Sequence, residues 1–485
     1  MSSRLALLCL FLLTGCATPR LAGPPVAPPV LTHGTAVGEV TDITAVVWGR
    51  CDRAATLHVR LTDSERSLAE VVDPERDFTA RLALDGLQPD TSYGYRAWCG
   101  DGSDADDGAR GARAGQFRTT PARDASRALR IAFSGDLGGQ NVCRDAAHGY
   151  PIFAIIAARR PDLFIALGDM IYGDDTCRAV GRYGNAQVAG PPPARTTSEY
   201  WAHWRYNRAD AGHQALLATT PMAPVWDDHE IGNDAGPGDP RLPAARAAFL
   251  DYQPLRPPAD APTQLYRSQR WGKHLELFFL DLRQYRADNA APDDAAAPKP
   301  LLGAAQVAWL IESMAASDAT WKVLIASVPL AIPTGAATAR DGVASGDSAG
   351  GFEGEIVALF RALQARGVRP PLWLTTDVHF ATGFRHRPLP EHPEWVVQEV
   401  VTGPLNAGLF PQRQLDPTFQ PERTFFWGPK TADAVASFDD AVGWFNFGML
   451  EILASGRLSI VVINGTGQTV YRTSLRPDAT PAAPR

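Results

Sequence analysis

Short apolar runs bounded by turn residues recur from residue 129 onward. Such runs predict buried strands, and they cover residues 131–133, 165–167, 222–225 and 372–374. Between them lie amphipathic segments that predict helices, at residues 150–160, 198–217 and 304–314. Alternation of strands with amphipathic helices is typical of an α/β layered domain.

A different pattern fills residues 31–120. Residues 44–48, 56–60 and 78–84 form short alternating or β-branched runs separated by turn clusters. This pattern predicts a small antiparallel all-β domain. The segment around Tyr93 resembles the tyrosine corner of fibronectin type III-like sandwiches.

Other stretches predict connections between elements. Residues 119–123 predict a linker after the β-domain. The Gly/Pro-rich stretches 181–194 and 404–429 predict surface loops near the site described next.

Side chains suited to metal binding follow four of the predicted strands. Side chains at the carboxyl ends of such strands face a common crevice, and Asp377 and His379, at i and i+2, can share one face. Carboxylates, a phenol and imidazoles gathered in one crevice predict a dinuclear metal site. The candidate residues are Asp136, Asp169, Tyr172, Asp228, His229, Asp377 and His379.

Composition narrows the function classes. With 45% hydrophobic and 20% charged residues, the 485-residue chain has ordinary globular composition and enough length for more than one domain. Its formal net charge of -7 comes without acidic or basic blocks, so nothing indicates nucleic-acid binding. No apolar stretch beyond the amino terminus is long enough to cross a bilayer.

The amino terminus predicts a targeting segment. Arg4 precedes an apolar run at residues 5–13 that is too short for a transmembrane helix. The run closes at Leu13-Thr14-Gly15-Cys16, which resembles a bacterial lipobox. That resemblance implies a lipoprotein signal peptide over residues 1–16, lipidation of Cys16, and a membrane-anchored protein on a periplasmic or outer-membrane face. An ordinary cleaved secretory signal is the alternative, and residues 17–30 form a Pro-rich tether.

The cysteines fit an exported protein. Setting aside Cys9, within the signal, and the lipobox cysteine leaves an even set of four. We predict a disulfide between Cys51 and Cys99 in the first domain and another between Cys143 and Cys177, next to the metal site. Buried free thiols, or Cys143 as a metal ligand, are the alternatives.

The motifs in this order resemble the PhoD-like alkaline phosphatases, a branch of the calcineurin-like metallophosphoesterases. Asp169 and Tyr172 match a GDxxY motif, Asp228 and His229 match WDDHE, and Asp377 and His379 match DVH. Residues 279–286 and 401–406 also look like family segments, so the resemblance covers nearly the whole mature chain.

The resemblance implies a fold. We expect an α/β metallophosphoesterase domain at residues 127–476, built as a four-layer αββα sandwich. An all-β fibronectin III-like sandwich of the PhoD amino-terminal type is expected before it, at residues 31–120.

The residue types also suggest the metals. One site would take Asp136, Tyr172 and His379, with Asp169 as the bridge, and a phenolate among carboxylates suits Fe(III). The other would take Asp169, Asp228 and Asp377, an all-oxygen set that favours Ca²⁺, Mg²⁺ or Mn²⁺ over Zn²⁺. The family resemblance implies an iron and calcium centre.

Two positions depart from the family pattern. Several PhoD-like proteins have Cys where Asp136 stands. Many relatives also place a histidine after the strand of the segment that here covers residues 321–329, whereas this chain has none there. The second metal therefore has one protein ligand fewer and more water.

The expected function is that of a metal-dependent phosphoesterase, in which a metal-bound hydroxide attacks phosphorus in line. We expect His229 to hydrogen-bond the phosphoryl group or protonate the leaving alkoxide. Arg283 is a candidate for contacting substrate oxygens through its fork geometry, and a salt bridge with Asp281 is the alternative.

Each residue alone has a simpler interpretation. Asp136 resembles a turn residue or helix cap, Tyr172 a core side chain, and His229 a satisfied buried histidine. Asp227 and Glu230 would orient their neighbours or face solvent, and Asn233 and Asp234 would form a turn or support the metal ligands.

Three functions remain open from the sequence. The leading one is a lipid-anchored, monomeric phosphomonoesterase or phosphodiesterase acting on extracellular esters. The second is a phosphodiesterase specific for lipid head groups or wall polymers. The third is a non-enzymatic surface-binding lipoprotein with an inactive second domain.

Overall fold

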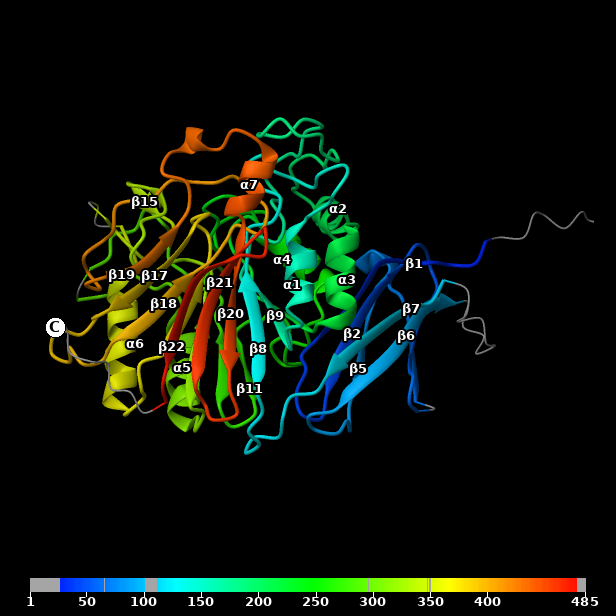
Figure 1. Ribbon diagram of the computed structural model, residues 1–485, viewed down its shortest axis with the longest axis horizontal. Coiled ribbons are helices and arrows are strands. Elements are labelled where there is room, and N and C mark those ends of the chain that lie inside the picture. Colours follow the sequence, from blue (N-terminus) through cyan, green and yellow to red (C-terminus); the bar gives the residue numbers. More distant parts are fainter. Residues whose placement is uncertain are drawn as a thin grey trace, which may run out of the picture.

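A computed structural model describes residues 27–64, 66–100, 111–294, 296–346, 348 and 350–477. Its amino-terminal part is a sandwich of two antiparallel sheets, with strand orders β1-β2-β5 and β4-β3-β6-β7 (Figure 1). The strands are β1 (Leu31–Gly38), β2 (Ala45–Cys51), β3 (Thr56–Leu61), β4 (Ser67–Val71), β5 (Thr79–Leu84), β6 (Ser92–Gly100) and β7 (Arg113–Arg118).

A disulfide joins the two sheets of this sandwich, and a tyrosine hydroxyl holds one of its corners. The Cys51–Cys99 disulfide links β2 in one sheet to β6 in the other. The Tyr93 hydroxyl accepts a hydrogen bond of 2.8 Å from the backbone N–H of Gln88, as expected for a tyrosine corner. Between the sheets lies an apolar core of side chains such as Val47, which is fully buried.

Two larger sheets form the centre of the molecule. One has the order β10-β9-β8-β20-β21-β22 and the other β11-β12-β13-β16-β18-β17-β19. The first contains β8 (Leu129–Ser134), β9 (Leu163–Ala166), β10 (Met222–Pro224), β20 (Asn446–Ile452), β21 (Leu458–Asn464) and β22 (Thr469–Leu475). The second contains β11 (Arg267–Trp271), β12 (Leu275–Phe279), β13 (Trp321–Ile325), β16 (Leu372–Thr375), β17 (Ala381–His386), β18 (Val397–Val401) and β19 (Glu422–Trp427). A short hairpin pairs β14 (Gly335–Ala336) with β15 (Ala339–Arg340).

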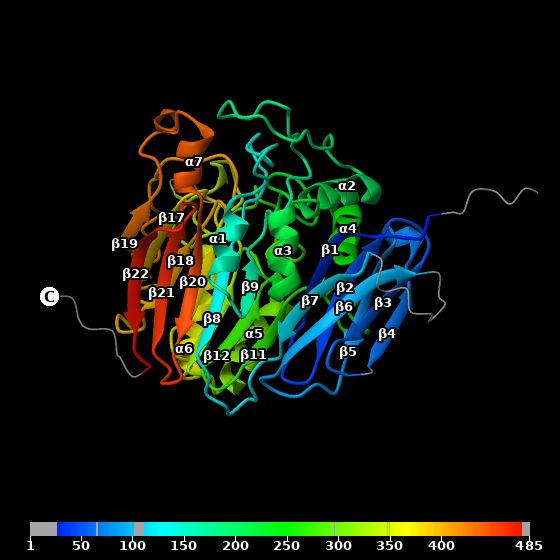
Figure 2. The same ribbon diagram turned by 45° about the vertical axis from the view of Figure 1, so that its right-hand side comes forward.

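The expected four-layer αββα sandwich is confirmed. Buried apolar side chains from both large sheets, such as Phe133 and Ile325, share one core. A second core joins the first sheet to the helices on its outer face, and a third joins the other sheet to its helices (Figure 2). The helices on the first sheet are α1 (Ile152–Ala158), α2 (Thr197–Arg208), α3 (Ala211–Thr219) and α4 (Leu242–Tyr252). Those on the second sheet are α5 (Ala304–Ala316) and α6 (Glu353–Ala365). The short helix α7 (Phe438–Trp444) lies at the upper edge of the sheets in Figure 1.

Two local expectations were wrong. The single helix expected at residues 198–217 is two helices, because the Asp210 carboxylate accepts from the backbone N–H of His213 and begins a new helix at α3. The stretch 404–429, expected to be a loop, contains the edge strand β19, which pairs with β17. Within the described part of the chain, no helix is long and apolar enough to cross a membrane.

A buried polar cluster fastens the amino-terminal sandwich to the helices of the larger domain. Asp77 forms hydrogen bonds of 2.9 Å with the Arg50 guanidinium, within the same sandwich. Its carboxylate also contacts Arg205 of α2 and the hydroxyl of Tyr252 at the end of α4. The Trp48 indole N–H donates to the carbonyl of Asp251 at 2.7 Å. Because these groups are largely removed from water, the sandwich is held in a fixed position on α2 and α4.

Candidate metal centre

The predicted site residues follow the carboxyl ends of β8, β9 and β10, which are parallel neighbours in the first large sheet, and of β16 in the second, where it runs parallel to β13 and β18. The backbone is strained there, because four of these non-glycine residues have positive φ angles. The values are 62° for Asp136, 52° for Asp169, 75° for Asp377 and 57° for His379. The strands β8, β9 and β16 therefore each end in a sharp turn that carries a candidate ligand.

Asp136, Tyr172 and His379 form one group. The Tyr172 hydroxyl lies 2.9 Å from Nε2 of His379, and that nitrogen is 3.9 Å from Oδ1 of Asp136. Nδ1 of His379 contacts the carbonyl oxygen of Gly408. Since a carbonyl only accepts hydrogen bonds, Nδ1 carries the proton and Nε2 presents a lone pair to this group.

Gly403 allows the backbone to pass close to the Asp136 carboxylate. A Cβ atom at Gly403, whose φ is 125°, would lie 2.2 Å from Oδ2 of Asp136. Only a residue without a side chain therefore fits beside the carboxylate. Oδ2 instead accepts a 2.6 Å hydrogen bond from the Thr376 hydroxyl.

Asp169, Asp228 and His229 form a second group. Ligand atoms of these three side chains lie within 4.8 Å of one another, a spacing compatible with one cation. The backbone N–H of His229 donates to Oδ1 of Asp169 at 3.2 Å. His229 thus stands among the candidate ligands as well as in the catalytic role expected from the sequence. Its Nδ1 lies 2.7 Å from Oδ1 of Asp174.

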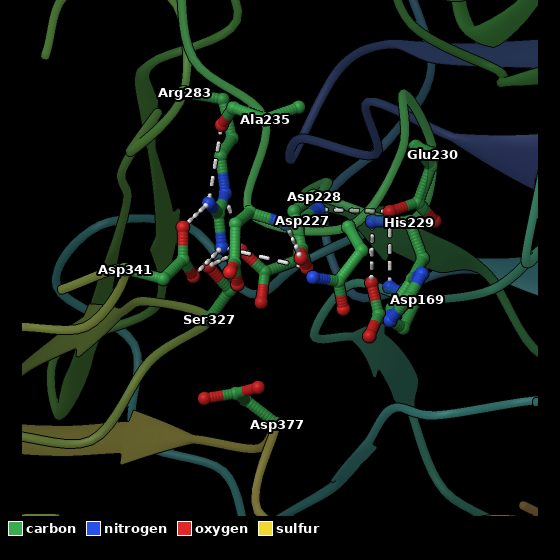
Figure 3. Close-up of polar contacts among 12 residues, drawn as sticks. Asp169, Asp227, Asp228, His229, Glu230, Ala235, Arg283, Ser327, Asp341 and Asp377 are labelled. Carbon is green, nitrogen blue, oxygen red and sulfur yellow. Dashed lines mark hydrogen bonds and ion pairs between the residues drawn. The ribbon is translucent and has the colours of Figure 1, made fainter. Parts of the chain in front are cut away.

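Asp377 lies near both groups without a strong partner for its carboxylate. Its backbone N–H donates to Oδ1 of Asp136 at 3.3 Å, whereas its Oδ2 is buried and accepts no hydrogen bond from the described residues. In Figure 3 this carboxylate lies opposite the cluster around Arg283 with no dashed contact. A buried carboxylate oxygen without a donor is costly, and a cation would satisfy it.

The electrostatics of the site favour cations. Burial raises the pKa of Asp136 to about 7. Burial, followed by repulsion from neighbouring carboxylates, raises the pKa of Asp169 and that of Asp377 well above the usual range. Among the described residues, none of these three carboxylates forms an ion pair with a lysine or arginine. Buried carboxylates that repel one another without a basic partner are the donor set that hard metal ions need.

His229 has the opposite environment. Burial alone would lower its pKa, but the negative charges of Asp228 and Asp174 outweigh burial and raise the pKa to about 10. The surrounding carboxylates therefore favour the protonated imidazole. The centroid of its ring lies 4.2 Å from that of the Tyr172 ring, so the two groups of residues are in direct contact.

Arg283 has partners other than the one considered from the sequence. Its side chain does not pair with Asp281, which instead accepts from the Trp226 indole at 2.9 Å. The fully buried guanidinium donates to Asp227 at 2.7 Å and to Oδ2 of Asp341 at 2.9 Å (Figure 3). Its Nη2 also lies 3.5 Å from Asp228. The fork thus holds three carboxylates inside the protein, which is the role of a positioning residue.

Several supporting side chains surround the two groups of candidate ligands. Glu230 accepts hydrogen bonds from the backbone N–H groups of Asp169, at 3.0 Å, and Asp227, at 2.8 Å, and so ties the loops after β9 and β10 together. Ser327, in the segment without the family's histidine, donates to Asp227 at 2.6 Å. Glu230 therefore orients its neighbours, which is one of the two interpretations considered for it from the sequence, and Ser327 was not expected from the sequence to have a role.

Asp341 and Asp174 carried no signal in the sequence, whereas Asp234 was expected either to form a turn or to support the metal ligands. Asp341 lies in a turn-rich segment far from any motif, and its ligand atoms lie within 4.8 Å of those of Asp228 and Asp234. The backbone N–H of Asp234 donates to Oδ2 of Asp228 at 2.6 Å, so this residue supports a candidate ligand directly. Only the folded chain brings Asp341 to the site.

Both cysteine pairs expected from the sequence are disulfides in the structure. Cys143 is therefore bonded to Cys177 and is not a metal ligand. Its bridge joins the loop after Asp136 to the loop after Tyr172. Cys16 and the signal segment lie outside the described residues.

Two face-to-face sheets between helical layers, with carboxylates and imidazoles at their strand ends, define a metallophosphoesterase-like protein. The chain belongs to the PhoD-like phosphatase family. The family model described as PhoD-like phosphatase matches residues 136–454, and the PhoD-like phosphatase N-terminal domain matches residues 15–121. The family resemblance inferred from the motifs is thereby confirmed.

Individual relatives agree with this assignment. Alkaline phosphatase D of Bacillus subtilis (strain 168) is 28% identical over 338 residues, covering 65% of this chain and 55% of that protein. The match therefore spans little more than half the length of that relative.

Two solved structures share the fold. The structure of PhoD matches with a TM-score of 0.72 and 21% identity, over 93% of this chain and 94% of that one. Purple acid phosphatase PPD1 from yellow lupin (Lupinus luteus) seeds matches with a TM-score of 0.61 and 13% identity, over 92% of this chain and 74% of that one.

Proposed function

We propose that the protein is a metal-dependent phosphoesterase of the alkaline phosphatase D type, which hydrolyses phosphomonoesters, phosphodiesters or both at a dinuclear centre. The observation that carries this proposal is the set of buried carboxylates at four strand ends. Three of them, Asp136, Asp169 and Asp377, have no lysine or arginine partner among the described residues, and the set stands beside a phenol and an imidazole whose Nε2 is free of its proton.

The two groups of residues divide the proposed ligands. Asp136, Tyr172 and His379 would hold one ion, and a phenol among carboxylates favours Fe(III) there. Asp228 and Asp377 would hold the other, with Ca²⁺ as the first candidate and Mn²⁺, Mg²⁺ or Zn²⁺ as alternatives. Asp169 would serve both. Two such cations neutralise the charge on phosphoryl oxygens and make water acidic enough to act as a nucleophile near neutral pH.

His229 supplies a proton in this proposal. Asp174 holds its Nδ1 at 2.7 Å and so fixes the ring, leaving Nε2 as the group that donates to a phosphoryl oxygen or to the leaving alkoxide. Arg283 does not contact the substrate, because its guanidinium is already hydrogen-bonded to Asp227 and Asp341. Its role is to keep Asp228 in place.

Metal content and hydrolysis, measured on the same preparation, test the proposal. Protein purified without chelator or affinity metal should contain two metal ions per chain by plasma mass spectrometry. It should also hydrolyse p-nitrophenyl phosphate or its bis ester, and the ratio of the two rates separates monoesterase from diesterase. A chain that binds no metal after reconstitution and hydrolyses neither ester would instead be a non-enzymatic binding protein.

Two substitutions separate metal binding from proton transfer. Asp169→Asn should abolish turnover and lower the metal content together, because both proposed ions lose a ligand. His229→Ala should lower kcat by about 10²- to 10⁴-fold, the usual contribution of general acid catalysis, with metal retained. Loss of metal from the His229→Ala protein would make this imidazole a ligand rather than the acid.

We also propose that the protein is exported and anchored through a lipid on Cys16. The lipobox sequence supports this placement, as do two disulfides, since such bonds persist in oxidising compartments. Radiolabelled palmitate should enter the wild-type protein and not the Cys16→Ser variant. Equal labelling of both would exclude this anchor.

A further inference from the structure

A cavity of about 490 Å³ lies outside the two groups of proposed ligands. Its lining combines two cationic side chains, Arg340 and Arg413, with the apolar surfaces of Pro333, Leu415 and Pro417. Both arginines are half-buried. A volume of this size holds a small organic group rather than a few water molecules.

Backbone carbonyl groups hold the two guanidinium groups in place. Arg340 donates to the carbonyl oxygens of Ser345, at 2.9 Å, and Gly335, at 3.1 Å. Arg413 donates to the carbonyl oxygen of Pro333 at 3.2 Å. Within the described ranges, no carboxylate lies within ion-pair distance of either side chain. Positive charge fixed in a concave surface is suited to an anion.

One acidic side chain in the cavity wall is already engaged by backbone N–H groups. Asp416 lies between Leu415 and Pro417 in the chain, but its Oδ2 accepts from the backbone N–H of Gly346 at 2.8 Å. Its Oδ1 accepts from the backbone N–H of Thr418 at 2.8 Å. This carboxylate therefore shapes the wall of the cavity and leaves the arginines available.

The cavity borders the metal centre through one aromatic ring. The Arg413 guanidinium lies 5.5 Å from the ring centroid of Phe410, and that ring stacks on His379 with centroids 4.5 Å apart. Leu415 packs on the small apolar cluster that includes Val378, between Asp377 and His379 in the chain. On the other side, Arg340 immediately precedes Asp341, the partner of Arg283.

We propose that this cavity binds a second anionic group of the substrate, so that the preferred esters carry a phosphate or carboxylate besides the phosphoryl group at the metal centre. The arginines bind the distal anion, and the apolar walls contact the carbon chain that joins the two groups. This inference rests on the phosphoesterase function proposed above and names the substrate class of the same site.

A series of alkyl esters tests the inference with the metal-loaded protein. The wild type should show a higher kcat/KM for α,ω-alkanediol bisphosphates than for alkyl monophosphates of equal chain length, with an optimum at one spacer length. Arg340→Gln combined with Arg413→Gln should reduce that preference at least tenfold, since a charge-assisted contact contributes about 1.5–3 kcal/mol and 1.4 kcal/mol corresponds to a tenfold change.

A matched control and a binding measurement complete the design. Arg369 also donates to a proline carbonyl, that of Pro477 at 2.6 Å, but does not line the cavity. Arg369→Gln should leave the preference unchanged, and Arg413→Lys should restore part of it. Calorimetric titration with hexane-1,6-bisphosphonate should show weaker binding to the double variant, whose metal content and melting temperature confirm that it is folded.

The outcomes separate the two proposals. A wild type that hydrolyses p-nitrophenyl phosphate but shows equal kcat/KM for bisphosphates and monophosphates at every spacer length would overturn the anion subsite and leave the phosphoesterase function standing. A preference that survives in the double variant would also overturn it. No hydrolysis of any ester by the metal-loaded wild type would overturn both.

Discussion

The Tyr172 hydroxyl lies 2.9 Å from Nε2 of His379, although 207 residues separate the two in the chain. The Gly408 carbonyl holds the opposite nitrogen of the imidazole, so the phenol donates its proton to Nε2. A bound cation would replace that proton and bind both atoms at once. The pair thus links the GDxxY and DVH motifs into one half of the proposed metal centre.

We predict that Tyr172→Phe lowers iron content and leaves the second metal nearly unchanged. The substitution keeps the buried ring and removes only the oxygen that favours Fe(III). Plasma mass spectrometry of both proteins gives the two metal contents per chain. Tyr93→Phe is the control, because the Tyr93 hydroxyl accepts from the backbone N–H of Gln88 at 2.8 Å in the amino-terminal sandwich, away from the proposed ligands. Equal iron in the wild type and the Tyr172 variant would remove the phenol from the ligand set.

The Arg283–Asp341 ion pair gives a second prediction. Asp341→Asn should lower the free energy of unfolding by about 3–5 kcal/mol, the usual effect of removing one partner from a buried charge pair. It should also weaken binding of the second metal about 10- to 100-fold, because Arg283 positions Asp228. Urea unfolding and metal titration measure the two effects.

Asp318→Asn serves as the control for that experiment. This carboxylate pairs with Arg123 at 3.0 Å and Arg270 at 2.8 Å, but its side chain is 62% exposed. Exposed pairs contribute at most about 1 kcal/mol, so its loss should be small. If the two variants unfold at the same urea concentration, the buried pair contributes no more to the free energy of unfolding than the exposed pairs do.

Stability should fall at mildly acid pH because of His213. Burial, followed by the positive charge of Arg208, lowers the pKa of this histidine to about 3. Its ring stacks on Phe153 with centroids 4.3 Å apart. In the unfolded chain its pKa is about 6.5. Between these values the unfolded state binds the extra proton, so this contribution to stability is complete above pH 6.5 and lost as the pH falls toward 3.

The expected slope is up to about 1.4 kcal/mol per pH unit from this one group. Melting curves of the wild type and His213→Gln between pH 4 and 7 measure it, and the slope should be shallower in the variant whatever its absolute stability. His392→Gln is the control, because this side chain is 38% exposed. Parallel curves for the wild type and His213→Gln would assign the acid sensitivity to other groups.

The candidate ligands were predictable because each directly follows an apolar strand. Asp136, Asp169 and Asp377 are signalled by local sequence alone, and the layered fold follows from the alternation of strands and helices. Asp341 was not predictable, since a turn-rich segment places it beside Arg283 only after β12 and the hairpin β14–β15 have formed. The break between α2 and α3 was missed because apolar periodicity continues through Asp210, whose capping carboxylate overrides it.

The partners of Arg283 show a related limit. The sequence places Asp281 two residues away, which favours a local ion pair, but the guanidinium extends to Asp227 and Asp341 in other loops. The burial of the Arg283 side chain favours the distant carboxylates over the local ion pair. The fully buried guanidinium engages carboxylates from two different loops, which hold it in a fixed orientation.

The Cys143–Cys177 disulfide connects to the metal centre through one glutamine. Cys143 closes the loop that carries Gln140, whose Oε1 accepts from the backbone N–H of Gly408 at 3.2 Å. The carbonyl of Gly408 in turn holds Nδ1 of His379. Loosening this loop should therefore disturb the orientation of a proposed ligand.

We accordingly expect the Cys143→Ser/Cys177→Ser double variant to lose iron as well as stability. The bridge spans 34 residues, and releasing a loop of that length costs about 4 kcal/mol in the chain-entropy model. The Cys51→Ser/Cys99→Ser variant releases a 48-residue loop at nearly the same cost, but its bridge lies within the amino-terminal sandwich. Chemical unfolding should give similar losses for the two variants, whereas plasma mass spectrometry should find iron depleted only in the first. Equal iron in both would mean that the loop positions His379 without its disulfide.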